Sequence, residues 1–284
     1  MFRCMTPGAI GVKGTFEEQL NFAKAAGFEG MDVGLGPLGE MAKKMGVDGI
    51  KELFRKAGLR VGGAAVAPGW RASEADHKAL LEALPAQAEA AAKVGATGCM
   101  TWITPQSETM PFRENFRFHA NRLRPVAQIL KDHGLKLGLE PVSPRTSRDG
   151  KKYGFIYTMA GMLGLAEAIG TGNVGLLVDS WHWYTALGTA SDLAMLTADD
   201  VVHVHINDAP AGVLVEKQLD NTRALPGETG VIDLSAFLQC LKKIGYQGAV
   251  SPEPFSAKLK TMTPEQCAKT VGDCLMRVWK AAGV

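Results

Sequence analysis

The sequence predicts an α/β protein that folds as a closed (β/α)8 barrel. Helical stretches repeatedly end in a glycine that is followed within a few residues by an apolar, strand-like run; these glycines are Gly27, Gly58, Gly95, Gly134, Gly170 and Gly245. Glycine is favoured just past a helix because it adopts the left-handed backbone conformation without a Cβ clash. The glycines recur about every 35 residues, with one gap of about two units, so the 284 residues divide into eight βα units.

The individual elements follow from this repeat in order. The predicted strands are Arg3–Met5, Gly30–Val33, Arg60–Ala65, Gly98–Trp102, Lys136–Glu140, Gly175–Asp179, Val201–His205 and Ala249–Glu253. Capping residues mark the starts of helices between them: Thr15 forms a capping box with Glu18, Asp233 caps a later helix, and Thr263 precedes the proline that opens the last one.

A doubly wound open sheet is the main competing fold. It usually carries a glycine-rich nucleotide loop after its first strand, but the first loop here, TPGAIGVKGT, contains neither GxGxxG nor a Walker-type GK[ST]. No linker or low-complexity tract divides the chain. Residues 1–284 are therefore expected to form a single barrel domain.

The composition is that of an ordinary globular protein, with 46% hydrophobic and 21% charged residues and a net charge of +2. Because Lys and Arg are spread along the chain, we expect neither nucleic acid nor a membrane as a partner. The amino-terminal MFRCMTPGAIG lacks the apolar stretch of a secretory signal, and no apolar run is long enough to cross a bilayer, so a cytoplasmic protein is expected. Five cysteines without CxxC spacing are expected to be reduced and mostly buried.

Four polar residues end four successive predicted strands: Glu140 in LKLGLEPV, Asp179 in VGLLVDSWHW, His205 in VVHVHIND and Glu253 in GAVSPEPF. The carboxyl ends of the strands in a closed barrel meet on one rim, so these side chains should converge there and place the active site. A buried carboxylate is costly unless it is neutralised, which predicts one shared divalent cation. Oxygen-rich ligands favour Mn²⁺ or Mg²⁺, with Co²⁺ or Zn²⁺ as substitutes. Taken singly, each residue could be a loop carboxylate or a core histidine.

Several phrases carry a resemblance to a known family. LEP, DSWH, HVHIND, PGETGVID and SPEPF resemble motifs of the sugar phosphate isomerase/epimerase-like superfamily, the xylose isomerase-like TIM barrels. The resemblance implies that Glu140, Asp179, His205 and Glu253 are the metal ligands, in the family's Glu, Asp, His, Glu order. It also implies that Glu140 and Glu253 are the catalytic acid and base.

The predicted function is a divalent-metal-dependent isomerase or epimerase of a keto-sugar, keto-polyol or small hydroxy-keto acid. One glutamate would remove the proton beside the carbonyl to leave a metal-stabilised enediolate, and the other would return a proton. Loss of a β-substituent would instead make the same site a dehydratase or lyase acting on an oxidised sugar, inositol or glycoside. The substrate is expected to be a small carbohydrate-like molecule.

Two further function classes are less favoured. An apurinic endonuclease on a similar barrel needs several more histidine ligands, but His77, His119 and His133 fall on predicted helices. The near-neutral charge also argues against a surface that tracks phosphates. A barrel that only binds a ligand does not need two opposed glutamates around one ion.

Other residues are expected to contact the substrate. His182 in DSWH and Arg223 before PGETG resemble substrate-binding residues of the family. The alternative for His182 is that it covers the barrel mouth, and the alternative for Arg223 is a solvated loop arginine. Four tryptophans lie at or just after predicted strand ends: Trp70, Trp102, Trp181 and Trp183. An indole face at this position either stacks on a sugar or packs the rim, and Trp102 is expected to contact the substrate.

Support residues and loops complete the sequence predictions. His203 lies two residues before His205, so it points to the same side of the strand and is expected to support His205 from a deeper layer. Asp208 would orient His205 or accept a substrate hydroxyl. The basic loop 144–154, PRTSRDGKKYG, is a candidate lid or anion contact, or simply a solvated loop. The resemblance also favours a homodimer or homotetramer.

Overall fold

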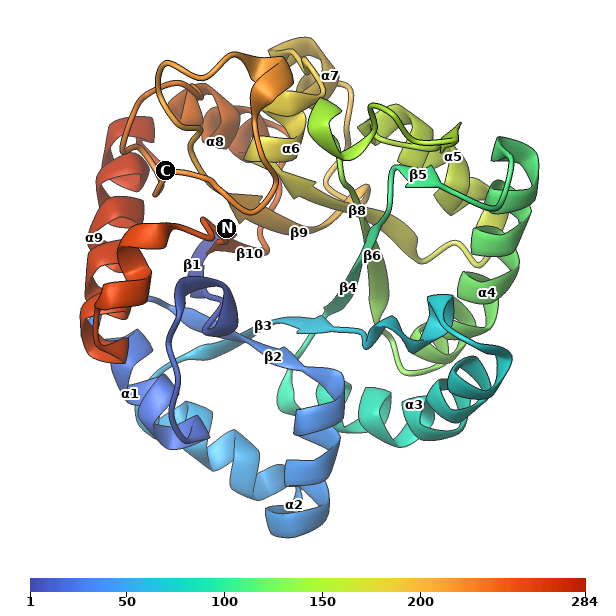
Figure 1. Ribbon diagram of the computed structural model, residues 1–284. Coiled ribbons are helices and arrows are strands. Elements are labelled where there is room, and N and C mark those ends of the chain that lie inside the picture. The colour runs from blue at the N-terminus through green and yellow to red at the C-terminus, as the bar shows by residue number, and fades with distance from the viewer.

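The computed structural model describes residues 1–284 and confirms the predicted (β/α)8 barrel. Eight parallel strands close into one sheet, in which each strand pairs with its neighbours along the chain and the last strand pairs with the first. The strands are β1 (Phe2–Met5), β2 (Gly30–Gly34), β3 (Arg60–Ala65), β4 (Gly98–Ile103), β6 (Lys136–Pro141), β8 (Val174–Asp179), β9 (Val201–Ile206) and β10 (Ala249–Pro252). Figure 1 shows them as a central ring surrounded by helices.

The outer ring consists of the helices that connect the strands (Figure 1). They are α1 (Phe16–Ala25), α2 (Leu35–Ala57), α3 (Glu74–Val94), α4 (Phe112–Asp132), α5 (Met159–Ile169), α6 (Ser180–Thr185), α7 (Ala190–Ala194), α8 (Leu234–Lys243) and α9 (Pro264–Ala282). Two short helices, α6 and α7, follow β8, which explains the double spacing between the glycines of that region. No helix is both long and apolar enough to cross a membrane.

The local signals in the sequence have the predicted structural effect. Gly58 and Gly95 follow α2 and α3 with φ of 68° and 101°, in the left-handed region where a Cβ would clash. The capping box of Thr15 and Glu18 is present, and the Asp233 side chain accepts the backbone N–H of Ala236. These caps fix where each helix starts, and hence how it returns to the barrel.

The strand bounds agree with the predicted ones to within one residue at each end. The difference matters at β10, because Glu253 follows the strand instead of ending it. A small antiparallel sheet of β5 (Gln106–Ser107) and β7 (Tyr153–Gly154) joins the loop after β4 to the loop after β6. The basic loop is thereby attached to the rim at its end.

The apolar core fills the space between the barrel and its helices. All five cysteines are free thiols, and only Cys240 is partly exposed, as the sequence predicted. Inside the barrel the side chains include polar groups from several strands, among them Asp32, His203 and Ser251, which are all buried. The polar interior continues up to the rim at the carboxyl ends of β6, β8, β9 and β10.

Candidate metal centre

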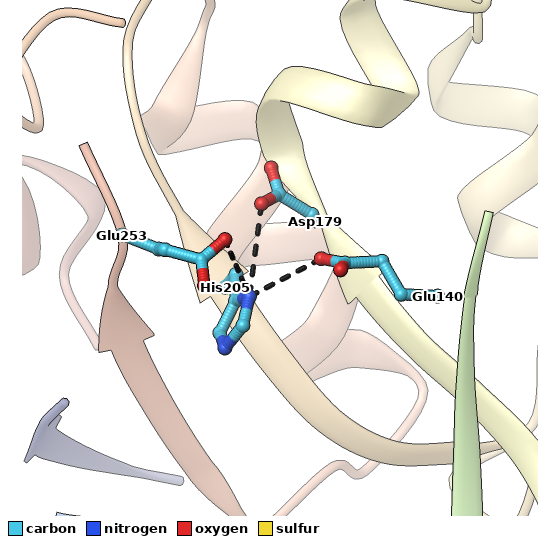
Figure 2. A group of neighbouring side chains, drawn as sticks. All are labelled: Glu140, Asp179, His205 and Glu253. Atoms are coloured by element: carbon cyan, nitrogen blue, oxygen red, sulfur yellow. Dashed lines mark hydrogen bonds and ion pairs between the residues drawn. The ribbon is translucent and has the colours of Figure 1, made fainter. Parts of the chain in front are cut away.

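The four strand-end residues meet in one group at the rim of the barrel. The Nδ1 atom of His205 lies 3.2 Å from Glu140 Oε1, 3.8 Å from Asp179 Oδ2 and 3.3 Å from Glu253 Oε2. One ligand atom from each of the four residues lies within 4.8 Å of the others. Figure 2 shows the three carboxylates directed at the imidazole from different sides. Glu140, Asp179, His205 and Glu253 form what we term the rim group.

The barrel register explains why residues 113 positions apart in the chain come together. Asp179 and His205 are paired residues of the adjacent strands β8 and β9, and His205 is paired with Ser251 of β10, two residues before Glu253. Residues paired across parallel strands point to the same face of the sheet. The side chains of the rim group therefore project inward at the carboxyl end of the barrel.

The rim group is buried and strongly charged. Burial alone would lower the pKa of the His205 imidazole, but the carboxylates of Glu253 and Glu140 outweigh this effect and raise it well above its usual value. Burial would raise the pKa of Glu253, but His205 and the guanidinium of Arg223 hold it below the usual range. Three carboxylates thus share a site with two cationic side chains, which leaves negative charge in excess.

Arg223 is part of this electrostatic arrangement. Its Nη1 atom lies 2.9 Å from Asp179 Oδ2 and 3.2 Å from Glu253 Oε2, and its Nη2 atom lies 3.0 Å from Asp220 Oδ1. Burial would lower the pKa of the guanidinium, but these acids raise it further above its usual value. The guanidinium carbon lies 4.8 Å from the ring centroid of Trp181 and 5.0 Å from that of Phe255. Arg223 is therefore fixed in both charge and orientation.

Asn207 is a site residue that the sequence reasoning missed. Its side-chain amide donates to Asp179 Oδ2 at 3.1 Å, and its carbonyl oxygen accepts the backbone N–H of Glu253 at 2.7 Å. One amide thus connects the carboxylate that ends β8 to the residue that follows β10. The sequence feature that could have indicated Asn207 as a site residue is its position two residues after His205 in HVHIND.

His182 lies on the first turn of α6, beside the rim group. Asp179 caps this helix by accepting the backbone N–H groups of Trp181 and His182. The Nδ1 atom of His182 accepts the backbone N–H of Ser143 at 3.2 Å. The Nε2 atom lies 3.3 Å from Arg223 Nη2, which places His182 beside the guanidinium that pairs with Asp179 and Glu253.

The two support residues occupy different environments. The His203 ring meets the His205 ring edge to face, with centroids 5.3 Å apart, and its Nε2 atom lies 3.5 Å from Asp32 Oδ2. Asp208, which was expected to orient His205 or meet the substrate, instead accepts backbone N–H groups from the following loop, at positions 209, 229, 230 and 232. Its role in the structure is to hold the loop that carries Arg223.

The tryptophans and the basic loop are also placed by the structure. Trp70 and Trp181 are fully buried and so cannot stack on a substrate, whereas Trp102 is 47% exposed. Trp183 packs against Phe237 and donates its indole N–H to a backbone carbonyl, as rim packing does. In the basic loop, Arg145 pairs with Asp149, Lys151 pairs with Glu108, and Arg148 donates to the carbonyl oxygen of Ser143, whereas Lys152 lies over the Tyr153 ring.

The donor set of the rim group fits a divalent cation. Oxygen and nitrogen ligands bind such ions at about 2.0–2.6 Å, so the ligands of one ion lie up to about 4–5 Å apart, as the four donor atoms do. Carboxylate oxygens with one imidazole nitrogen suit a hard to borderline metal. His77, His119 and His133 contribute nothing to the group, since they lie on α3, on α4 and at its end.

Known sequences are similar to this chain over part of its length. An inosose isomerase of Halalkalibacterium halodurans is 30% identical over 161 residues, which cover 56% of this chain and 53% of that protein. A 3-dehydroshikimate dehydratase of Pseudomonas aeruginosa is 28% identical over 138 residues, or 48% of this chain and 20% of that protein. The chain therefore matches about half the length of the inosose isomerase and a smaller part of the dehydratase.

Solved structures share the whole barrel. A xylose isomerase domain protein from Alicyclobacillus acidocaldarius has a TM-score of 0.89 and 32% identity over 100% of both chains. An IOLI protein with a bound zinc atom has a TM-score of 0.80 and 20% identity over 99% of both chains. A D-psicose 3-epimerase studied with D-fructose has a TM-score of 0.76 and 15% identity over 100% of both, and these last two show the fold alone.

The relatives and structural neighbours thus include an isomerase, an epimerase and a dehydratase, all enzymes of small carbohydrate-like molecules. The family model of the xylose isomerase-like TIM barrel matches residues 20–275, which is most of the sequence and includes the whole rim group. The chain belongs to the xylose isomerase-like TIM barrel family.

Proposed function

We propose that this protein is a divalent-metal-dependent isomerase or epimerase of a keto-polyol, keto-sugar or small hydroxy-keto acid. The observation that carries the proposal is the pair of glutamates in the rim group. Glu140 from β6 and Glu253 after β10 approach the same His205 Nδ1 atom, at 3.2 and 3.3 Å, from strands on either side of β8 and β9. Two opposed carboxylates around one cation suit proton transfer at a single substrate carbon.

Each member of the rim group has a role in this proposal. Glu140, Asp179, His205 and Glu253 would hold one divalent cation, with Mn²⁺ or Mg²⁺ preferred and Co²⁺ or Zn²⁺ as substitutes. Such a cation would polarise the substrate carbonyl and so lower the barrier to removing the proton on the adjacent carbon. Glu140 and Glu253 then divide the proton transfer, one removing the proton and the other returning it on the opposite face or at the neighbouring carbon.

The neighbouring side chains prepare this transfer. Arg223 holds Glu253 ionised and oriented, so we propose that Arg223 acts on the substrate through Glu253. His182 lies beside Arg223 and would contact a substrate oxygen. Trp102 offers the exposed indole face that the other tryptophans near the rim lack, and would stack on the carbon chain of the substrate.

Exchange of deuterium from solvent tests the proposal directly. Protein stripped with a chelator and then reloaded with Mn²⁺, Mg²⁺, Co²⁺ or Zn²⁺ should incorporate deuterium from D₂O into an inosose, a ketohexose or a hydroxy-keto acid. Mass spectrometry measures the incorporation. The stripped protein should lose it and the reloaded protein should regain it. Exchange that is unaffected by chelation would show that no metal takes part.

A second candidate function is supported by the dehydratase among the relatives. The same proton removal followed by loss of a β-hydroxyl gives a lyase, and the rim group does not distinguish the two outcomes. The mass of the product decides between them, because isomerisation conserves the mass of the substrate and dehydration lowers it by one water.

A further inference from the structure

Arg71 is a second arginine at the rim whose charge has no counterpart in the protein. It ends a short 3-10 turn (Pro68–Arg71) between β3 and α3. Its guanidinium carbon lies 3.6 Å from the ring centroid of Trp102 and 4.8 Å from that of Trp70. Trp70 is fully buried and Trp102 is 47% exposed, so one indole faces the core and the other faces the rim. The two rings fix the position of the guanidinium.

The hydrogen-bonding capacity of Arg71 is almost unused. Its Nη2 atom makes one long contact, 3.4 Å to Thr101 Oγ1, while Nε and Nη1 are buried without a partner. No carboxylate forms an ion pair with it. Burial accordingly lowers the pKa of the Arg71 guanidinium to about 10, whereas four acids raise that of Arg223. Arg71 is thus a partly buried cation without a neutralising group.

The other basic residues of the rim differ in this respect. Arg223 pairs with Asp179, Glu253 and Asp220. In the basic loop, Arg145 pairs with Asp149 and Lys151 with Glu108, while Arg148 donates to the carbonyl oxygen of Ser143. Lys152 has no acidic partner but is exposed to solvent. Leaving a cation unpaired and partly desolvated is costly, and a planar carboxylate that accepts two guanidinium N–H bonds would remove this cost.

Arg71 is also close to the rim group. Trp102, which covers its guanidinium, is the residue of β4 that pairs with Glu140 of β6 in the barrel sheet. Glu140, Trp102 and Arg71 therefore follow one another along the rim. A substrate held at the rim group by its carbonyl end would extend over Trp102 toward the guanidinium.

We propose that Arg71 binds a carboxylate at the end of the substrate remote from the reacting carbonyl. The proposal rests on the proposed function and narrows its substrate class to hydroxy-keto acids, such as a ketose whose terminal carbon is oxidised. The Trp102 indole lies against the guanidinium, so its fluorescence reports binding of the carboxylate.

A matched pair of ligands tests the assignment. D-fructose and D-fructuronate share the hydroxy-ketone end and differ at the other end, which is an alcohol in the first and a carboxylate in the second. Tryptophan fluorescence titrations of the metal-loaded protein should show about 10- to 100-fold tighter binding of the acid, as expected for charge-assisted hydrogen bonds. Arg71→Met should abolish this preference, and Arg71→Lys should retain part of it.

Controls keep the result specific to Arg71. Arg145→Met removes another rim cation, one that already has an acidic partner, and should leave the preference unchanged. Equal binding of the two sugars by the unaltered protein, or an undiminished preference in Arg71→Met, would overturn the proposal. If neither sugar binds, the protein and Arg71→Met are titrated with sodium acetate. A fluorescence response to acetate that is the same in both would also overturn the proposal.

The binding measurement is independent of catalysis. A preference for the acid that depends on Arg71, in a protein that shows no deuterium exchange, would support the carboxylate site and contradict the proposed function. Metal-dependent deuterium exchange on D-fructose, together with unchanged binding of both sugars by Arg71→Met, would support the proposed function and contradict the carboxylate site. The two proposals can therefore fail separately.

Discussion

Two buried groups inside the barrel are built from the same residue types but differ in how their charges are satisfied. In the rim group, three carboxylates surround His205, and only Arg223 and Asn207 donate further hydrogen bonds to them from outside the α6 turn. The second group centres on Asp32, whose carboxylate accepts from the donors Thr6 Oγ1, Gly63 N, Ser251 Oγ and Cys4 Sγ, and lies 3.5 Å from His203 Nε2.

The difference separates a carboxylate that the protein itself satisfies from carboxylates that keep an excess of negative charge. Burial would raise the pKa of Asp32, but His203 and the hydrogen bonds from Ser251 and Thr6 hold it well below its usual value. Asp32 is thus ionised and fully satisfied by the protein itself. The rim group has more carboxylates than cationic partners, so it is the group that gains from a divalent ion.

The largest expected effect comes from removing one negative charge in each group. Glu253→Gln should lower turnover by about 10²- to 10⁴-fold, since it removes one of the two groups that we propose to transfer the proton. Asp32→Asn should leave the chemical step nearly intact. Asp32 contacts no member of the rim group directly and reaches His205 only through His203. Steady-state kinetics with the substrate found by deuterium exchange measures both variants, and equal losses would show that the two groups do not differ in function.

The next effect concerns the two arginines of the rim. Arg223→Met leaves Asp179 and Glu253 without their common partner and should lower the free energy of unfolding by about 3–5 kcal/mol, as breaking a buried ion pair does. Arg71→Met removes a cation that has no acidic partner, so its cost should be within about 1 kcal/mol. Urea denaturation at pH 7 in the absence of added metal compares the two. A similar loss in both variants would mean that packing between the aromatic rings, and not charge pairing, dominates.

These expectations show how far the sequence alone could lead. The rim group was predictable because strand ends follow from apolar runs and glycines, and a closed barrel brings all those ends together. Glu253 lies one residue beyond β10, yet the prediction held because the convergence tolerates such a shift. Asp208 was wrongly expected to face the rim group, since two neighbouring residues after a strand can turn toward different partners.

The residues missed by the sequence reasoning depend on contacts that no local pattern reveals. Asp32 lies in a strand whose apolar neighbours indicate only burial, and its four donors come from three other strands or their ends. Arg71 lies in a short turn where an arginine is ordinarily solvated. Its partial burial between Trp70 and Trp102 requires the packing of the β3 and β4 loops to be known.

A substitution at the glycine next to Asp32 should have a smaller effect, on stability, that is specific to the group centred on Asp32. A Cβ at Gly62 would overlap Asp32 Oδ1 and Cys4 Sγ inside the barrel. Gly62→Ala should therefore destabilise the fold by about 1–3 kcal/mol, as overpacking of a core does, while leaving metal affinity within a few-fold. Urea denaturation and calorimetric titration of Mn²⁺ measure the two quantities. Gly36→Ala is the matched control, since an added Cβ there meets nothing.

The smallest expected effect is a pH dependence that belongs to Asp32. Because its pKa is lower in the folded protein than in the unfolded chain, ionised Asp32 stabilises the fold at every pH above its unfolded pKa of about 3.9, and this contribution decreases as the pH falls below that value. The stability difference between the protein and Asp32→Asn should be constant from pH 7 to pH 5 and should shrink toward pH 3. Urea denaturation across this range measures it, with Asp48→Asn, at the surface, as the control. A difference that persists unchanged at pH 3 would show that Asp32 stabilises the barrel through its shape and not through its charge.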